Sequence, residues 1–144
     1  MFGVLTGGCL CGAVRYEYDG EVGPASYCHC ADCRRCTGSA FNIGVRVEAR
    51  RFRVLRGSPK AFTKTGDSGN ELTRHFCPEC ASPLYTSSPH HPDSYYLKAG
   101  CLDDPTIVRA THQSWVKSRV PWATISSDLS SFSEGSSNSI PTDV

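Results

Sequence analysis

Hydrophobic and polar residues alternate over several short stretches of this 144-residue chain. The alternation has a period of two, which is typical of half-buried β-strands because their successive side chains point to opposite faces. Turn-forming residues, as in Asp19-Gly20 and Gly57-Ser58-Pro59, separate the stretches. We therefore expect strands at residues 14–18, 41–47, 52–55, 61–63, 72–76 and 95–100.

Helical periodicity does not extend beyond two turns in any window of the sequence. The segment 28–36 has room for at most a turn or two of helix, since Gly38 follows soon after. The pattern thus predicts a mainly β protein with several strands in one or two small antiparallel sheets. A chain of 144 residues has the usual length of a single domain with a substantial core.

The last part of the chain differs in composition. From Ser126 onward, eight of 19 residues are serine and few are apolar. A segment of this kind buries too little surface to offset the entropy lost on ordering. We expect one domain over residues 1–133 and a mobile, serine-rich tail over residues 134–144.

The charge and hydropathy of the chain argue against several classes of protein. Fifteen basic and 14 acidic residues leave a net charge of +1, which argues against a dedicated binder of nucleic acid or of a membrane surface. Residues 1–8 lack a signal-peptide pattern, and no apolar run approaches the roughly 20 residues needed to cross a bilayer. We expect a cytoplasmic protein with no nucleic-acid or membrane partner.

Cysteine is the most informative residue type in this sequence, which contains nine of them. Eight lie in close groups with C-x-C or C-x2-C spacing, whereas Cys101 stands apart. An odd number, the lack of a signal peptide and these spacings suit metal thiolates in a reducing compartment better than disulfides. We predict zinc, two ions per chain, as the cofactor.

Five motifs carry a resemblance to a known family. In order they are Gly8-Cys9-Leu10-Cys11-Gly12, Cys28-His29-Cys30-Ala31-Asp32-Cys33-Arg34, Phe76-Cys77-Pro78-Glu79-Cys80, Gly100-Cys101-Leu102-Asp103-Asp104-Pro105 and Pro121-Trp122. Over about residues 5–133 the chain resembles the glutathione-dependent formaldehyde-activating enzymes, a family that includes centromere protein V. The resemblance implies a β-tent fold with two zinc sites. It also implies a carbon–sulfur lyase activity that joins formaldehyde to glutathione as S-hydroxymethylglutathione.

Cys9, Cys11, Cys77 and Cys80 form a complete four-thiolate set that joins two distant chain segments, as a closed structural zinc requires. The knuckle containing the second pair places Ala81 where glycine is usual, so we predict a positive φ at Ala81 or a slightly reshaped knuckle.

Cys28, Cys30 and Cys33 remain as a local three-thiolate site, and the family resemblance implies the same division into a structural and a catalytic zinc. Cys36 extends their spacing to C-x-C-x2-C-x2-C. It is therefore a possible fourth ligand that would close the second site. Its role is left open at this point.

An open three-thiolate zinc is soft and suits a thiol substrate, so we expect a small thiol or thiol–aldehyde adduct as the partner. Arg34 and Arg35 are candidate contacts for an anionic part of that substrate. The alternative is a non-catalytic interaction module braced by two closed zinc sites. Two tryptophans near the end of the chain also allow a homodimer.

Overall fold

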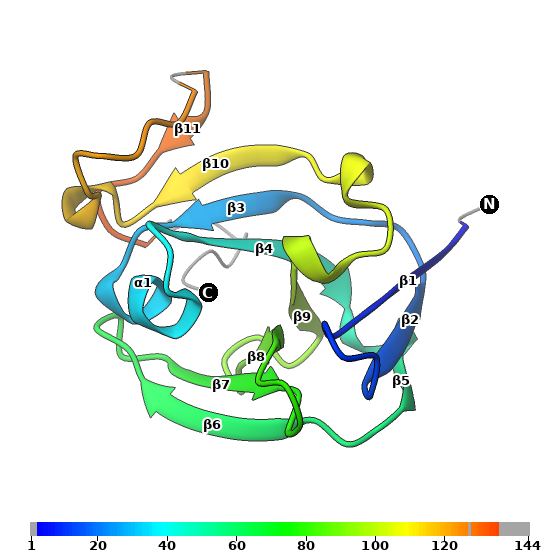
Figure 1. The fold of residues 1–144 in the computed structure, drawn as a ribbon. Coiled ribbons are helices and arrows are strands. Elements are labelled where there is room, and N and C mark those ends of the chain that lie inside the picture. Colours follow the sequence, from blue (N-terminus) through cyan, green and yellow to red (C-terminus); the bar gives the residue numbers. More distant parts are fainter. Residues whose placement is uncertain (1–2, 127, 136–144) are drawn as a thin grey trace.

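The computed structural model describes residues 3–126 and 128–135. The chain forms mainly short strands, together with one α-helix and several single turns of 3-10 helix (Figure 1). The strands are β1 (Val4–Gly8), β2 (Arg15–Asp19), β3 (Ala25–Cys28), β4 (Asn42–Glu48), β5 (Phe52–Arg56), β6 (Lys60–Thr65), β7 (Glu71–Phe76), β8 (Pro83–Ser87), β9 (Ser94–Lys98), β10 (Ala110–Ser114) and β11 (Ser130–Ser131). The helices are α1 (Ala31–Thr37), η1 (Ala49–Arg51), η2 (Ala99–Cys101), η3 (Pro105–Ile107) and η4 (Val116–Ser118).

The strands make two sheets. Strands β1, β2 and β5 form a three-stranded antiparallel sheet in the order β1-β2-β5, and the others form one sheet in the order β11-β10-β3-β4-β9-β8-β7-β6. The larger sheet curves, so that β10, β3 and β4 lie along the top of Figure 1 and β7 and β6 along the bottom. The predicted mainly β, single-domain architecture is confirmed, and it contains cysteine groups that could brace the predicted β-tent with a metal ion.

One edge of the larger sheet departs from the expected antiparallel pattern. Strand β10 runs parallel to β3 on one side and to β11 on the other. A parallel pair needs a long crossover connection, and here the chain passes through most of the fold between β3 and β10. The larger sheet is also bigger than the small sheets that the sequence predicted.

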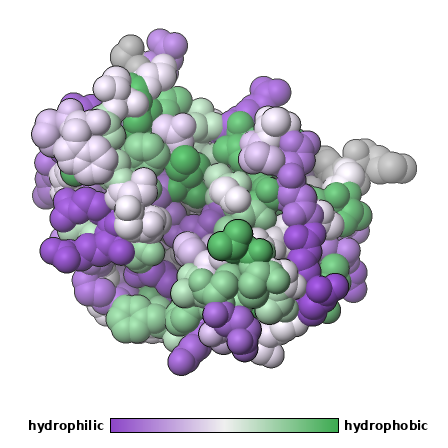
Figure 2. Space-filling view, viewed as in Figure 1, coloured by the Kyte–Doolittle hydropathy of each residue, from purple (hydrophilic) through white to green (hydrophobic). Residues whose placement is uncertain are grey.

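The core lies between the two sheets. On β2, alternate residues point inward, as the period of two requires, whereas consecutive residues of β8 and β9 are buried. The residues buried there include Tyr16, Tyr18, Val45, Val47, Phe52, Leu84, Leu97 and Leu102. Figure 2 shows hydrophobic residues gathered across the middle of the visible face between hydrophilic margins.

Helix α1 begins and ends with defined caps. The Cys33 N–H donates to Sγ of Cys30 at 3.3 Å at the start, and the Gly38 N–H donates to the Arg34 carbonyl at 2.9 Å at the end. Gly38 has a φ of 68°, a left-handed conformation that glycine adopts without strain. The helix of seven residues keeps within the one or two turns that the sequence allowed, and the residue that caps its start is itself a candidate metal ligand.

Among the residues that the structure describes, no helix has the length and hydrophobicity of a membrane span. Most of the predicted tail over residues 134–144 lies outside the described ranges. Glu134, at its start, accepts the Trp115 N–H at 3.0 Å.

Candidate metal centres

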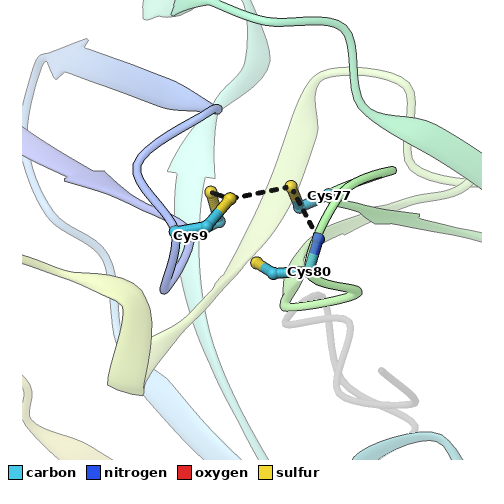
Figure 3. A group of neighbouring side chains, drawn as sticks. Cys9, Cys77 and Cys80 are labelled. Atoms are coloured by element: carbon cyan, nitrogen blue, oxygen red, sulfur yellow. Dashed lines mark hydrogen bonds between the residues drawn. The ribbon is translucent and has the colours of Figure 1, made fainter.

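Four cysteines from two distant loops bring their sulfur atoms together, and we call them the first cysteine group. Cys9 and Cys11 lie between β1 and β2, and Cys77 and Cys80 lie between β7 and β8. All four Sγ atoms are within 4.8 Å of one another. Figure 3 shows Cys9, Cys77 and Cys80 of this group with their sulfur atoms facing one another. The Sγ atom of Cys11 lies 3.6 Å from that of Cys9 and 3.8 Å from that of Cys77.

Backbone N–H groups point at the buried sulfurs of this group. The Val14 N–H donates to Cys9 Sγ at 3.2 Å, and the Glu79 and Cys80 N–H groups donate to Cys77 Sγ at 3.3 and 3.5 Å. Hydrogen bonds to a charged form favour that form, so these amides suit thiolates rather than thiols.

Both loops of the first group turn in the same way. Gly12 and Ala81, which directly follow Cys11 and Cys80, have φ values of 80° and 64°. The Gly12 N–H donates to the Cys9 carbonyl at 3.2 Å, and the Ala81 N–H donates to the Cys77 carbonyl at 2.9 Å. The predicted positive φ of Ala81 is therefore confirmed.

The dimensions of the first group fit a tetrahedral zinc ion. A Zn–S bond of about 2.3 Å gives a tetrahedron with S–S edges of about 3.8 Å. The two Sγ–Sγ distances of 3.6 and 3.8 Å lie near this value. All nine cysteines are free, so no disulfide competes for these sulfurs.

The second cysteine group contains Cys28, Cys30 and Cys33, whose Sγ atoms also lie within 4.8 Å of one another. Cys28 ends β3, Cys30 caps α1, and Cys33 lies in the first turn of that helix. Cys28 and Cys33 are fully buried, whereas Cys30 is partly exposed. The group is thus open to its surroundings mainly on the side of Cys30.

The three thiols of the second group shift one another's pKa values. Hydrogen bonds with Cys28 and then Cys33 lower the pKa of Cys30. The contact with Cys30 raises the pKa of Cys28, and the contact with Cys28 raises that of Cys33. Of the three sulfurs, Cys30 therefore ionises most readily without a metal ion. A divalent metal ion would displace the protons of the other two, as thiolate ligation requires.

Cys36 stands apart from this group of three. Its Sγ lies 3.5 Å from the Cys33 carbonyl and outside the set of sulfurs that fall within 4.8 Å. Contact with Cys33, together with the charges of Lys98 and Arg74, lowers the pKa of Cys36 to about 6. Cys36 is therefore a readily ionised sulfur beside the candidate metal centre.

Two basic residues that the sequence did not single out lie beside the second group. Arg74 on β7 interacts with the thiols of Cys33 and Cys36. Lys98 on β9 is only 7% exposed and donates to Oδ1 of Asn42 at 2.5 Å. The sequence offers one indication that Lys98 is buried, because this lysine lies at the end of a predicted strand that is otherwise largely hydrophobic.

Trp115 and His29 complete the surroundings of the second group. Trp115 is buried against Cys28 and Cys33 and adopts a left-handed φ of 57°, which a large side chain rarely does. His29 is also buried, and its Nε2 lies 2.8 Å from Oε1 of Gln113. These contacts fix the end of β3 against β10.

Arg34 and Arg35, the predicted substrate contacts, lie on α1. Arg34 is partly exposed and Arg35 is exposed. Their role stays a prediction.

Two cysteine groups, the second of which lies in sequence between the two pairs of the first, point to one known family. The sequence model of the glutathione-dependent formaldehyde-activating enzymes matches residues 4–118. The chain belongs to this family. The matched span includes every member of both cysteine groups, so the predicted family assignment is confirmed.

One relative carries the name of this family, and one solved structure shares the fold. A Halomonas elongata protein named "Putative glutathione-dependent formaldehyde-activating enzyme" is 29% identical over 113 residues, or 69% of this chain. The chain spans 66% of that relative's length. A crystal structure of a Rhodobacter sphaeroides protein is 26% identical and covers 74% of this chain and 99% of its own, with a TM-score of 0.56. That likeness supports the fold.

Proposed function

We propose that the protein is a zinc-dependent carbon–sulfur lyase that forms or cleaves a thiol–aldehyde adduct resembling S-hydroxymethylglutathione. The second cysteine group is the proposed reaction site, and the first is the proposed structural zinc site. The observation that carries the proposal is the grouping of Cys28, Cys30 and Cys33 without Cys36. Three thiolates leave one position for substrate, as catalytic zinc sites do.

The reaction is an addition in one direction and an elimination in the other. The thiol sulfur forms a bond to the carbonyl carbon, the C=O π pair moves to oxygen, and the thiol proton ends on that oxygen. When bound at the second group, zinc would supply a soft centre that holds a thiol in its thiolate form.

The surrounding residues support thiolate chemistry. Three thiolates and one divalent ion carry a net charge of −1, and Arg74 and Lys98 place two positive charges beside them. Nearby positive charge favours the ionised form of an incoming thiol. Trp115 packs on Cys28 and Cys33 and excludes water from that side.

The proposed partner is a small thiol, with glutathione the family's named thiol, and an aldehyde. Pairing of two copies of the chain stays a prediction. Trp122 is 71% exposed, whereas Trp115 is buried at the second group. Of the two tryptophans, only Trp122 is thus available to such an interface.

The test uses zinc-loaded protein with glutathione and formaldehyde, and NMR exchange measures how fast the adduct forms and breaks down. We expect a clear acceleration that Cys33→Ser abolishes while the first metal ion is retained. Cys101→Ser is the matched control, because Cys101 belongs to neither group. If the native protein accelerates no thiol–aldehyde exchange, the lyase proposal is wrong and the interaction module with two closed zinc sites is favoured.

A further inference from the structure

A small cavity lies beside the second cysteine group. Its volume is about 210 Å³, and residues of α1, β6, β7 and β9 contribute to its walls. The residues that define its character are Cys36, Phe62, Arg74, Phe76, Pro83 and Lys98.

One side of the cavity is basic, formed by buried Lys98 and partly buried Arg74. Lys98 is 7% exposed, and the hydrogen bond to Asn42 uses one of the three protons of its ammonium group. Nη2 of Arg74 is buried and has no hydrogen-bond partner among the residues that the structure describes. Arg74 interacts with the thiols of Cys33 and Cys36, and Lys98 with Asn42, which offsets part of the cost of burying these charges. An anionic group in the cavity would meet two positive charges beyond these contacts.

The other walls are hydrophobic. Phe76 and Pro83 line the cavity, and Phe62 lines it from the edge strand β6 with 59% of its surface exposed. An exposed phenylalanine on an otherwise polar strand suits contact with the methylene groups of a ligand. The volume of 210 Å³ is below the roughly 300 Å³ at which pockets for whole small molecules begin. It fits one short arm of a substrate.

We propose that this cavity is a subsite for a short carboxylate-bearing arm of the thiol substrate. Arg74 and Lys98 bind the carboxylate, and Phe62 packs against the methylene groups that join it to sulfur. Cys36 lines the cavity and contacts Cys33, so the subsite lies next to the proposed reaction site. The inference rests on the proposed function, because it assumes that the second cysteine group holds the substrate sulfur.

If the subsite binds a carboxylate, the protein should bind a thiol that carries a carboxylate more tightly than a thiol of similar size that carries a hydroxyl group. We would measure the affinity of the zinc-loaded protein for 3-mercaptopropionate and 2-mercaptoethanol by calorimetry. The carboxylate should strengthen binding about tenfold, which corresponds to about 1.4 kcal/mol. Arg74→Gln should remove this difference, and Phe62→Ala should weaken binding of 3-mercaptopropionate. Arg119→Gln, at an exposed arginine, is the matched control and should keep the full preference.

Butyrate, which has the carboxylate but no sulfur, separates the subsite from the proposed lyase activity. We expect it to shift the amide NMR signals of Phe62, Arg74 and Lys98 in the native protein and not in Arg74→Gln. Equal affinity for the two thiols, with no butyrate shifts, would overturn the subsite and leave the lyase proposal standing. Butyrate shifts in a protein that binds no thiol would leave an anion-binding cavity and refute both the thiol subsite and the lyase proposal.

Discussion

The sulfur atoms of Cys11 and Cys77 lie 3.8 Å apart although 66 positions separate the two residues in the chain. Cys11 follows β1 of the smaller sheet, and Cys77 follows β7 of the larger one. The same junction includes the Leu10 N–H, which donates to Oγ of Ser82 at 3.0 Å. A metal ion at the first cysteine group would therefore hold the two sheets together.

Cys77→Ser should lose one metal ion and most of the stability of the fold. Structural zinc contributes roughly 10 to 16 kcal/mol in model peptides, which matches the roughly 5 to 15 kcal/mol stability of a whole domain. Circular dichroism on heating and the metal content of the purified protein measure both effects. Cys101→Ser should keep both metal ions and a nearly unchanged unfolding midpoint. A Cys77→Ser variant that retains two ions and the native midpoint would refute the structural role.

Ala81→Gly should leave the stability unchanged or raise it slightly. Ala81 has a φ of 64°, and a non-glycine residue in this conformation costs on the order of 1 kcal/mol. Relief of that strain offsets the greater freedom of glycine in the unfolded chain. Ala61→Gly on the exposed strand β6 is the control and should cost about 0.5 to 1 kcal/mol. Chemical denaturation of the two variants measures the difference, and an equal loss in both would show that Ala81 is unstrained.

His112 should make the protein less stable in mild acid. Burial lowers its pKa, and its buried Nε2 has no hydrogen-bond partner among the described residues, so the folded state favours the neutral ring. A lowered folded-state pKa means that the unfolded chain binds the proton more readily. The stability is then fully present above the ordinary histidine pKa of about 6.5 and falls as the pH drops below it.

His112→Asn removes this titration. Asparagine can keep the contact that Nδ1 of His112 makes with Oγ1 of Thr111 at 2.7 Å. Between about pH 7.5 and about pH 5.5, on either side of the ordinary pKa of about 6.5, the variant should lose less stability than the native protein. Denaturation curves at both pH values measure the change. His90→Asn, at an exposed histidine, should follow the native protein, and an identical pH dependence in all three proteins would contradict the prediction.

The sequence predicted both cysteine groups because the spacing of their ligands is local. Cys28, Cys30 and Cys33 lie in one short segment, so their proximity needs only a turn and the start of a helix. Within each pair of the first group, the two cysteines are also close in sequence. The two pairs were assigned to one site because four thiolates complete the coordination of a structural zinc ion.

Arg74 and Lys98 could not be predicted in the same way. Each lies on a strand far in sequence from Cys28, Cys30 and Cys33, and the curvature of the larger sheet brings both to the second group. A single arginine in a strand more often faces solvent, so the presence of arginine at position 74 does not by itself predict a place in a buried site. The cavity beside Cys36 therefore appears only in three dimensions.

The pattern of hydrophobic and polar residues did not predict strand β10, for a different reason. Its buried residues are His112, Gln113 and Ser114, which are polar. Hydrogen bonds replace apolar contacts on this strand. Oε1 of Gln113 lies 2.8 Å from Nε2 of His29, and Nε2 of Gln113 donates to Oγ of Ser131 at 2.9 Å. A buried strand of this kind shows no alternation of hydrophobic and polar residues. The parallel edge it forms was therefore missed.

The most direct test of an open three-thiolate site is to load native protein and Cys36→Ser with cadmium-113 and record their NMR spectra with and without a small thiol. We predict two cadmium signals in both proteins, one unaffected by the thiol and one that shifts as a further sulfur ligand binds. Loss of the second signal in Cys36→Ser, or a second signal that no thiol moves, would show that Cys36 closes the site and would contradict the proposed chemistry.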